Sequence, residues 1–527
     1  MKKAAPLRWS LVTTALGAFA IACLGATAAS AQATLRVRLN SDILSTNPGM
    51  QRDENTDAVM LHVVEGLVAS TENGGTAPML ARSWKVSADG RTYRFFLRPN
   101  ITFHNGAALT SREVAWSLRR YLADGSRWRC KAEFGPKGFT QVTNIRPIDR
   151  LTLDLVLTKP APFLLPTLAR ADCGGTGILH PASLSPDGSW RGPIGTGPFR
   201  LADWKRNQYV DLARFTGYHS RTEPMNGNGG GKRPLVDRIR FMVIPDGSSA
   251  RAALSRDSID VLDNLAANEL AGLKNTRGIT LLRTPTVDLY GLLLQTRDPL
   301  LADRRLRRAI ALSIDVSALT RVATRGTAIA NSSPVPSASP YFGPVERVRV
   351  VRDLREARAL ARASGYRGET ISLVTNRRYP QAFDAAIILQ AMAREAGIKF
   401  EISTLDWATQ LARYSRGDYQ TMIFGYSARL DPALTLDPII GSKDVDPRRL
   451  WERPAARALL RRAVDEPDRK KRQALFDALD RGFRHDVPAV ILFNTARTTA
   501  LSDRVTGFRG WPAGLPRLWN VAVKGSH

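Results

Sequence analysis

The residue types that most often carry catalysis are scarce in this chain, and none of them forms a recognisable catalytic motif. The chain has six histidines and three cysteines among 527 residues. No two histidines show the His-Glu-x-x-His spacing that binds zinc, and no Gly-x-Ser-x-Gly turn presents a nucleophilic serine. We therefore expect no catalytic residue, no metal and no cofactor. The histidines, expected in structural or surface positions, are His62, His104, His180, His219, His485 and His527.

A glycine-rich stretch at residues 226–232, Asn-Gly-Asn-Gly-Gly-Gly-Lys, has the composition of a phosphate-binding loop. Such a loop needs Ser or Thr after its lysine, followed by a helix whose N–H groups face the phosphate. Here Arg233 and Pro234 follow the lysine. We therefore expect a flexible surface loop with no role in binding.

The N-terminal residues have the layout of a secretory signal peptide. Lys2, Lys3 and Arg8 give a positive start, residues 11–22 are apolar, and residues 29–31 read Ala-Ser-Ala. These features predict cleavage after residue 31 and export to the periplasm. The alternative of a membrane anchor is disfavoured, because about 20 apolar residues are needed to span a bilayer.

The three cysteines have different expected roles. Cys23 opens the alternative of a lipoprotein acylated at this thiol, although the Ala-Ile-Ala before it lacks the usual leading Leu. Cys130 and Cys173 remain in the mature chain, and an oxidising periplasm favours a disulfide between them. Two free buried thiols are the alternative.

Length and charge narrow the class of protein. A mature chain of nearly 500 residues is too long for one core, so two or three domains are expected. The net charge of +28 comes mostly from arginine spread along the chain. Because these arginines form no tight basic block, nucleic-acid binding is not expected. The charge is read as a solvated surface that can attract acidic ligands.

The elements that must position any site alternate between strands and helices in the second half of the chain. Helices are expected after Asp303, Asp353 and Asp406, since each carboxylate can cap a helix N-terminus. This alternation predicts an α/β lobe with much parallel pairing. The strands expected here are residues 287–295, 371–375, 398–403 and 419–426.

The first half of the chain is richer in strands. Asp89-Gly90 between two alternating runs predicts a β-hairpin. Thr110 with Glu113 three residues later predicts a capping box at the start of a helix. Residues 57–68 show helical periodicity, with Val59, Val63 and Leu67 on one face.

Several motifs in order along the chain carry a resemblance to a known family. They are Pro-Met-Leu-Ala-Arg-Ser-Trp-Lys-Val-Ser-Ala-Asp-Gly at residues 78–90, Phe-His-Asn-Gly at 103–106, the helix start at 109–118, Ile-Gly-Thr-Gly-Pro-Phe at 194–199, and the helix start at 303–311. With these motifs the chain resembles the family 5 extracellular solute-binding proteins. That family includes dipeptide-, oligopeptide-, nickel-chelate- and opine-binding receptors of ABC importers.

The resemblance implies an α/β, two-lobed periplasmic binding protein fold with an extra subdomain, a hinge and a central cleft. We expect lobe I to combine residues 32–68, 180–283 and 495–527, with residues 69–179 as its extra subdomain. Residues 284–494 would form lobe II, and residues 1–31 the signal peptide. Closure of the lobes would bury the solute and let the importer distinguish loaded from empty receptor.

The resemblance also places the ligand anchors after the strand that ends near Tyr426. Oligopeptide receptors have there an aromatic residue and then an Asp that pairs with the peptide's α-ammonium. Here Tyr426 takes the aromatic place and Arg429 stands where the acidic anchor would be. A guanidinium can hold a carboxylate or phosphate but not an ammonium, so an acidic solute is favoured. The alternative is that Arg429 faces solvent or pairs with Asp431 or Asp437.

Four further residues are weaker candidates for contact with the solute. Tyr290 is expected on the strand that enters lobe II, Trp407 at a helix start, and Asn47 and Met50 after the first strand. Each has a structural alternative, because amphipathic aromatic side chains also serve packing.

The leading functional hypothesis is therefore a periplasmic receptor that delivers a peptide-like solute to an ABC permease and ATPase complex. It is expected to act as a monomer without nucleic acid. A periplasmic chaperone-like or interaction protein on the same scaffold is the alternative, and an envelope enzyme is disfavoured by the missing motifs.

Overall fold

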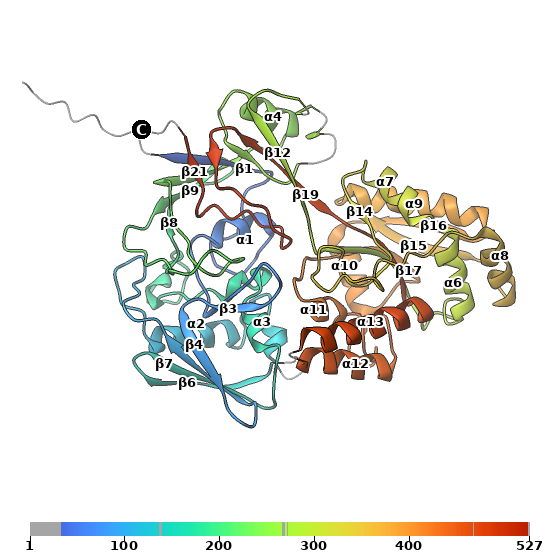
Figure 1. Ribbon diagram of the computed structural model, residues 1–527, viewed down its shortest axis with the longest axis horizontal. Helices are drawn as coiled ribbons and strands as arrows, with labels where there is room; N and C mark the ends of the chain where they lie inside the picture. Colours follow the sequence, from blue (N-terminus) through green and yellow to red (C-terminus); the bar gives the residue numbers. More distant parts are fainter. Residues whose placement is uncertain are drawn as a thin grey trace, which may run out of the picture.

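The structure, a computed structural model, describes residues 33–135, 140–265, 269–270, 272–273, 275–466 and 468–524. The predicted signal peptide, its cleavage site and Cys23 lie outside these residues. The described chain forms two lobes that lie side by side (Figure 1). Each lobe is built around its own sheet, as the predicted two-lobed α/β fold requires.

Lobe I contains a seven-stranded sheet in the order β12-β19-β11-β1-β10-β9-β8. Strand β1 pairs in parallel with β10, and buried apolar residues such as Leu35, Val37 and Phe241 form the core of this sheet. The strands come from three distant parts of the chain. They are β1 Thr34–Leu39, β8 Phe199–Lys205, β9 Tyr209–Arg214, β10 Arg238–Val243, β11 Val261–Leu262, β12 Ile279–Pro285 and β19 Ala496–Ser502.

Helix α1 (Glu54–Met60), helix α4 (Gly247–Ser255) and the short 3-10 turn η3 (Pro181–Ser183) accompany this sheet. Strands β20 (Val505–Thr506) and β21 (Ala522–Val523) pair near the C-terminal end.

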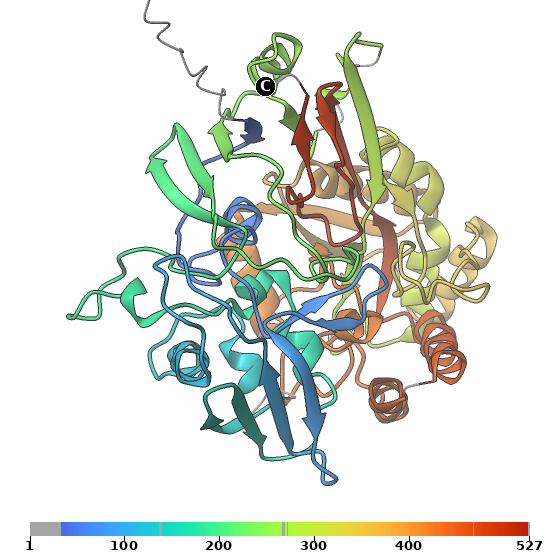
Figure 2. The same ribbon diagram turned by 60° about the vertical axis from the view of Figure 1, so that its left-hand side comes forward.

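A four-stranded antiparallel sheet, β4-β5-β7-β6, forms a separate unit within lobe I, at the opposite end from β12 in both views (Figures 1 and 2). Helix α2 packs on it, and Thr110 and Glu113 form the predicted capping box. Its elements are β2 Val68–Ser70, β3 Thr76–Pro78, β4 Ala81–Val86, β5 Thr92–Leu97, α2 Ser111–Leu122, η1 Lys131–Phe134, β6 Val142–Asp149, β7 Thr152–Leu157, α3 Leu164–Leu168 and η2 Ala171–Thr176.

Lobe II contains a six-stranded sheet in the order β14-β18-β13-β17-β15-β16. Strand β15 pairs in parallel with both β16 and β17, as the strand–helix alternation predicted. The strands are β13 Leu289–Leu294, β14 Ile329–Ala330, β15 Thr370–Asn376, β16 Lys399–Leu405, β17 Thr421–Tyr426 and β18 Ala489–Asn494.

Helices cover both faces of this sheet and form a further group beside lobe I (Figure 1). Asp303, Asp353 and Asp406 cap α6, α8 and α10 through their carboxylates, as predicted. The helices are α6 Arg304–Ser313, α7 Val316–Ala323, α8 Leu354–Ala363, α9 Pro380–Glu395, α10 Trp407–Arg416, α11 Pro432–Leu436, α12 Pro454–Asp465 and α13 Arg469–Asp486. Within the described ranges, no helix is both long and apolar enough to cross a membrane.

The chain passes between the lobes at β12–β13 and again at β18–β19. The two crossings are tied together, since Thr286 donates its backbone N–H to the carbonyl of Thr495 at 3.0 Å. The half-buried carboxylate of Asp288 also joins them through hydrogen bonds from both residues. These crossings are the covalent hinge between the lobes.

Two local predictions were wrong. The helix expected over residues 57–68 ends at Met60, because the chain then turns and residues 68–70 pair as β2 with β3. The glycine-rich stretch is not a surface loop: Lys232 is 2% exposed and its ammonium lies 3.3 Å from Glu65. Its glycines permit this burial, since a Cβ on Gly230 would lie 2.1 Å from the carbonyl oxygen of Pro224.

Candidate functional site

The two lobes contact each other near the end of β17. Phe163, at the start of α3 in the extra subdomain, is buried within an apolar cluster whose other buried members belong to lobe II. Gly74, in the turn between β2 and β3, lies so close to lobe II that a Cβ there would be 2.8 Å from the carbonyl oxygen of Leu430. The segment after Tyr426 therefore faces lobe I directly.

Arg429 lies in this segment, half-buried between the lobes. In the part of the chain that the structure describes, its guanidinium makes no hydrogen bond and no ion pair. Asp431 pairs instead with Arg472 at 2.9 Å, and Asp437 with Arg457 at 2.7 Å. The two structural partners considered from the sequence are thus engaged elsewhere.

The charges that act on Arg429 come from lobe I. Burial, and then the neighbouring guanidinium of Arg170, lower the pKa of Arg429, while Asp172 and Glu133 oppose that change. Arg429 belongs to lobe II, whereas the charged groups that act on it belong to the extra subdomain of lobe I.

This subdomain group is already paired internally. Arg170 donates to both oxygens of Asp172, at 2.9 and 2.7 Å, and to Glu133 at 3.1 Å. Burial would raise the pKa of Asp172, but the bidentate Arg170 outweighs it and holds that pKa below its ordinary value. The Asp172 carboxylate is therefore ionised and already bound by Arg170, and it makes no ion pair with Arg429.

A disulfide holds this group in place. It joins Cys130 and Cys173, with Cα atoms 5.4 Å apart. Cys130 precedes η1, which carries Glu133, and Cys173 follows Asp172 in η2. The predicted bridge thus fixes the two turns that carry the charges facing Arg429.

Arg52 and Asp57 form a second ion pair on the lobe I side. Burial is the largest cause that raises the pKa of Asp57 to about 7, and the attraction of Arg52 opposes it. The negative charge of nearby Asp172 adds to the increase in this pKa. The Oδ1 atom of Asp57 is buried without a hydrogen-bond partner in the described chain. This carboxylate therefore titrates near neutral pH.

The predicted aromatic residues of lobe II lie together at the carboxyl end of its strands. Tyr426 is buried, and its hydroxyl lies 3.4 Å from that of Tyr414. Trp407 is half-buried, stacked on Phe424 with ring centroids 5.8 Å apart and edge-on to Tyr379 at 5.1 Å. Trp407 retains exposed ring surface, whereas Tyr426 belongs mostly to the core.

Tyr290 lies one strand away on β13. Its ring stacks on Phe493 with centroids 4.9 Å apart, and its hydroxyl accepts a hydrogen bond from Gln381 at 3.1 Å. Burial is the largest cause that raises the pKa of Tyr290, and Glu54 of lobe I adds to it. Tyr290 is therefore a second point at which lobe I acts on lobe II.

Asn47 and Met50 lie on the lobe I side, against the extra subdomain. The Asn47 side chain accepts a hydrogen bond from Arg120 at 2.9 Å, and Met50 packs against the subdomain's apolar cluster. Between them, Gly49 leaves no room for a side chain, since a Cβ there would lie 2.6 Å from the ring of Trp128 and 2.8 Å from the carbonyl oxygen of Cys173. This loop therefore supports the disulfide-bonded turns, and the structure gives neither side chain a contact with Arg429.

The structure thus brings Arg429 together with residues that the sequence did not single out: Arg129, Glu133, Arg170 and Asp172. The one signal available was position, since Arg170 and Asp172 lie within three residues before Cys173 and Glu133 lies three residues after Cys130.

Comparison with known proteins gives consistent results. Residues 75–445 match the family model described as bacterial extracellular solute-binding proteins, family 5 middle. A dipeptide-binding protein of Escherichia coli K12 is 24% identical over 506 residues, covering 90% of this chain and 91% of the relative.

Solved structures share the fold. The protein AgaA from A. tumefaciens R10, in complex with agropinic acid, has a TM-score of 0.76 at 24% identity, covering 94% of this chain and 99% of that one. The protein DppA from Helicobacter pylori, in complex with the peptide STSA, has a TM-score of 0.77 at 21% identity with the same coverage.

Proposed function

This chain belongs to the family 5 bacterial extracellular solute-binding proteins, and from this premise we propose that it captures a small, acidic, peptide-like solute between its lobes. The family's role is to bind a solute for an ABC importer, and the relatives' names include receptors for dipeptides, glutathione and heme. The proposal that the solute is acidic comes from this chain's own residues and not from its relatives.

One observation carries the proposal: Arg429 lies between the lobes without a protein partner in the described chain, while the neighbouring cation Arg170 is paired with Asp172 and Glu133. A half-buried guanidinium that lacks a partner loses hydration without a compensating contact. A carboxylate of the solute would supply two parallel hydrogen bonds to it. The same position offers nothing to a free α-ammonium.

The remaining contacts would be apolar and aromatic. Trp407 lies at the start of helix α10, and Tyr290 lies on β13, which pairs with the strand that leads to Arg429. These two aromatic side chains favour a solute with an extended, partly apolar body. Asn47 and Met50 would act at a distance, by supporting the turns that carry Asp172.

The receptor is proposed to act outside the cytoplasm as a monomer that docks on its permease. The signal-peptide layout of the first 31 residues supports export. We also propose that it does no chemistry on its solute, because the sequence contains none of the catalytic motifs sought in it.

The test is to purify the protein from its native host and identify the bound solute by mass spectrometry. We expect a compound with at least one carboxylate or phosphate, and calorimetry with the authentic compound should give a one-to-one complex. A bound solute with no anionic group would contradict the acidic assignment while leaving the receptor role intact.

A further inference from the structure

The extra subdomain inserts one aromatic side chain into lobe II. Phe163 directly precedes helix α3 and is 3% exposed. The other described members of the apolar cluster around it belong to lobe II, and they include Leu436 of α11 and Leu460 of α12. Helix α3 lies beside these two helices in Figure 1. Phe163 is therefore buried by the contact between the lobes and not by the core of its own subdomain.

The core of the extra subdomain is a different apolar cluster. Leu164 and Leu168, which belong to α3 itself, are buried in that cluster together with Cys130 and Cys173. Helix α3 is thus anchored in its own subdomain, while the residue before it reaches into lobe II. Separation of the lobes would expose the Phe163 ring to water and would leave the subdomain core intact.

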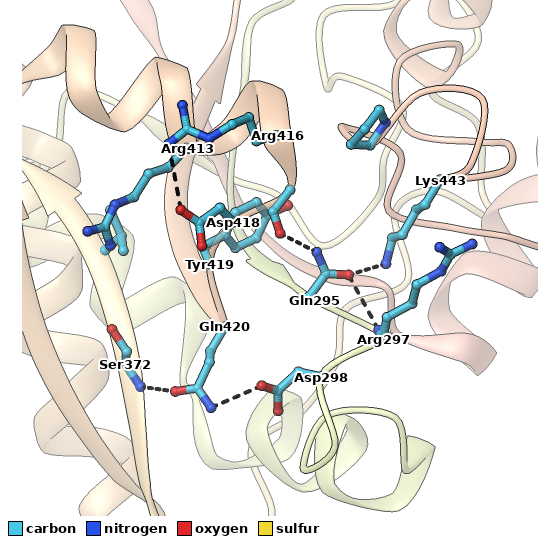
Figure 3. A pocket seen from close by; sticks show the side chains of 13 residues that line it. Gln295, Arg297, Asp298, Ser372, Arg413, Arg416, Asp418, Tyr419, Gln420 and Lys443 are labelled. Atoms are coloured by element: carbon cyan, nitrogen blue, oxygen red, sulfur yellow. Dashed lines mark hydrogen bonds and ion pairs between the residues drawn. The ribbon is translucent and has the colours of Figure 1, made fainter.

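Lobe II receives this ring as a rigid body. Around a polar pocket of about 660 Å³, side-chain amides tie its strands and loops together (Figure 3). Gln295, which follows β13, donates to the carbonyl of Gly417 at 2.7 Å. Gln420, which precedes β17, accepts from the backbone nitrogen of Ser372 at 2.8 Å. Because β13 and β17 also contribute to the cluster around Phe163, this contact acts on the whole lobe.

The segment that carries Phe163 also carries charges that act on Arg429. Arg170 and Asp172 follow α3, and the disulfide of Cys173 holds their turn. Entry of Phe163 into lobe II therefore brings these two charged residues toward Arg429. The influence of both residues on the pKa of Arg429 shows that they are close to it in the structure.

Arg429 opposes the same contact while no solute is bound. Its guanidinium is half-buried where the lobes meet, and it gains no hydrogen bond or ion pair from the residues that the structure describes. Loss of hydration without a compensating contact is unfavourable. Burial of Phe163 is favourable, since removing such a ring from water shifts an equilibrium by roughly 10- to 100-fold. The two residues thus act on the contact between the lobes with opposite signs.

We propose that burial of Phe163 in lobe II drives closure of the lobes, and that the unpaired charge of Arg429 limits this closure until an anionic group of the solute pairs with it. Phe163 is a positioning residue, because it contacts lobe II and not the solute. The empty receptor then keeps both open and closed states accessible, and an acidic solute shifts the population to the closed one. The role of Arg429 rests on the proposed function, whereas that of Phe163 does not.

The test measures the distance between the lobes in the full mature chain, freed of bound solute. Spin labels on Asp124→Cys in the extra subdomain and on Arg461→Cys of α12, both at exposed positions, report this distance by pulsed electron paramagnetic resonance. Cys130 and Cys173 form the disulfide and take no label. Phe163→Ala should raise the ratio of open to closed molecules by about tenfold or more, and Phe163→Leu should raise it less.

Removing the charge of Arg429 should have the opposite effect. Arg429→Met keeps an unbranched side chain without the guanidinium, so the empty receptor should close further. Phe163→Ala added to Arg429→Met should open the lobes again, which keeps the test decisive if the wild-type lobes are already mostly open. The matched control is Phe96→Ala, which removes a half-buried phenylalanine from β5 of the same subdomain and should leave the distances as in wild type.

The role of Phe163 is overturned if Phe163→Ala opens neither the wild type nor the Arg429→Met variant more than Phe96→Ala does. The role of Arg429 is overturned if Arg429→Met closes neither the wild type nor the Phe163→Ala variant. Phe163→Leu keeps the test valid if Phe163→Ala does not fold. Since all these distances are measured without solute, a bound solute that lacks an anionic group would contradict the proposed function and leave the result for Phe163 unchanged.

Discussion

The carboxylate of Asp288 accepts two hydrogen bonds from Thr495, one from its backbone nitrogen at 2.7 Å and one from its hydroxyl at 2.5 Å. Asp288 precedes β13 and Thr495 precedes β19, so this pair joins the two crossings between the lobes. Thr286 adds a third hydrogen bond to the same carboxylate, at 2.9 Å. The hinge is therefore a bonded unit and not two independent linkers.

Replacing Asp288 should loosen this unit. Asp288→Ala leaves the half-buried N–H of Thr495 without its acceptor and is expected to lower the free energy of unfolding by about 1–3 kcal/mol. Small-angle scattering of the solute-free variant should show a larger radius of gyration than wild type, because the lobes sample wider angles. Thr286→Val, which removes one of the three bonds, should give a smaller effect; equal melting temperatures for all three proteins would contradict the expectation.

Asp57 should make stability depend on pH. Its pKa in the folded protein is raised to about 7, so the folded state binds this proton more tightly than the unfolded chain does. The stabilisation of the folded state by the protonated acid is present below about pH 4 and is lost as the pH rises through 7. Asp57→Asn should therefore stabilise the protein more at pH 8 than at pH 4, by a difference on the order of 1–4 kcal/mol. Urea unfolding at the two pH values measures it.

The matched control for this prediction is Asp124→Asn, at a carboxylate that is exposed to solvent. Its effect on stability should be small at both pH values. If the effect of Asp57→Asn on the free energy of unfolding depends on pH no more than the effect of this control does, the Asp57 carboxylate ionises normally and pairs fully with Arg52.

The Cys130–Cys173 disulfide should affect both stability and solute binding. Its loop spans 43 residues in sequence, for which the chain-entropy relation gives about 4 kcal/mol of stabilisation. Cys130→Ala with Cys173→Ala should lower stability by that order, and it should also weaken solute binding, because both turns that face Arg429 lose their tie. Two reactive thiols in denatured, unreduced protein from the periplasm would show that the bridge does not form in the cell.

Much of the local structure could be predicted from the sequence because its causes are local. Asp303 and Asp406 cap their helices through bonds two or three residues away, and Thr110 with Glu113 does the same. The charged group around Arg429 could not be predicted in this way. Arg170, Asp172 and Arg52 are brought together by the packing of distant segments, and no spacing in the chain records that contact.

The glycine-rich stretch shows the same limit from the opposite direction. Its composition predicted exposure, yet Lys232 is buried against Glu65 and the ring of Trp519. These partners lie 167 residues before it and 287 residues after it in the numbering of the chain. Burial of a lysine depends on such distant partners, so local composition alone gave the wrong answer.

Export can be tested without a ligand. The mature protein from an envelope extract is expected to begin at Gln32, after the Ala-Ser-Ala site at residues 29–31. N-terminal sequencing measures this directly. A lipid-modified Cys23 as the first residue would contradict it and would place the receptor on the membrane surface.

The interlobe assignment depends most on Arg429, and a substitution series tests it. A charge-assisted hydrogen bond is worth roughly 1.5–3 kcal/mol, and a buried solute anion left unpaired costs about 2–5 kcal/mol. Arg429→Ala should therefore weaken binding by about 10- to 1,000-fold. Arg429→Lys should restore only part of the affinity, because the ammonium cannot form the planar pair of bonds.

Two further variants complete the series. Tyr426→Phe should bind nearly as wild type does, since the Tyr426 ring is buried and its hydroxyl meets only Tyr414 among the described residues. Arg394→Ala, at an exposed arginine of α9, controls for the loss of one positive charge. Calorimetry with the co-purified solute at two salt concentrations measures the affinity of all four variants.

If Arg429→Ala binds as tightly as Arg394→Ala, the Arg429 guanidinium contacts no anionic group of the solute, and the proposal of an acidic ligand is rejected. The family assignment would remain, because it rests on the match across residues 75–445.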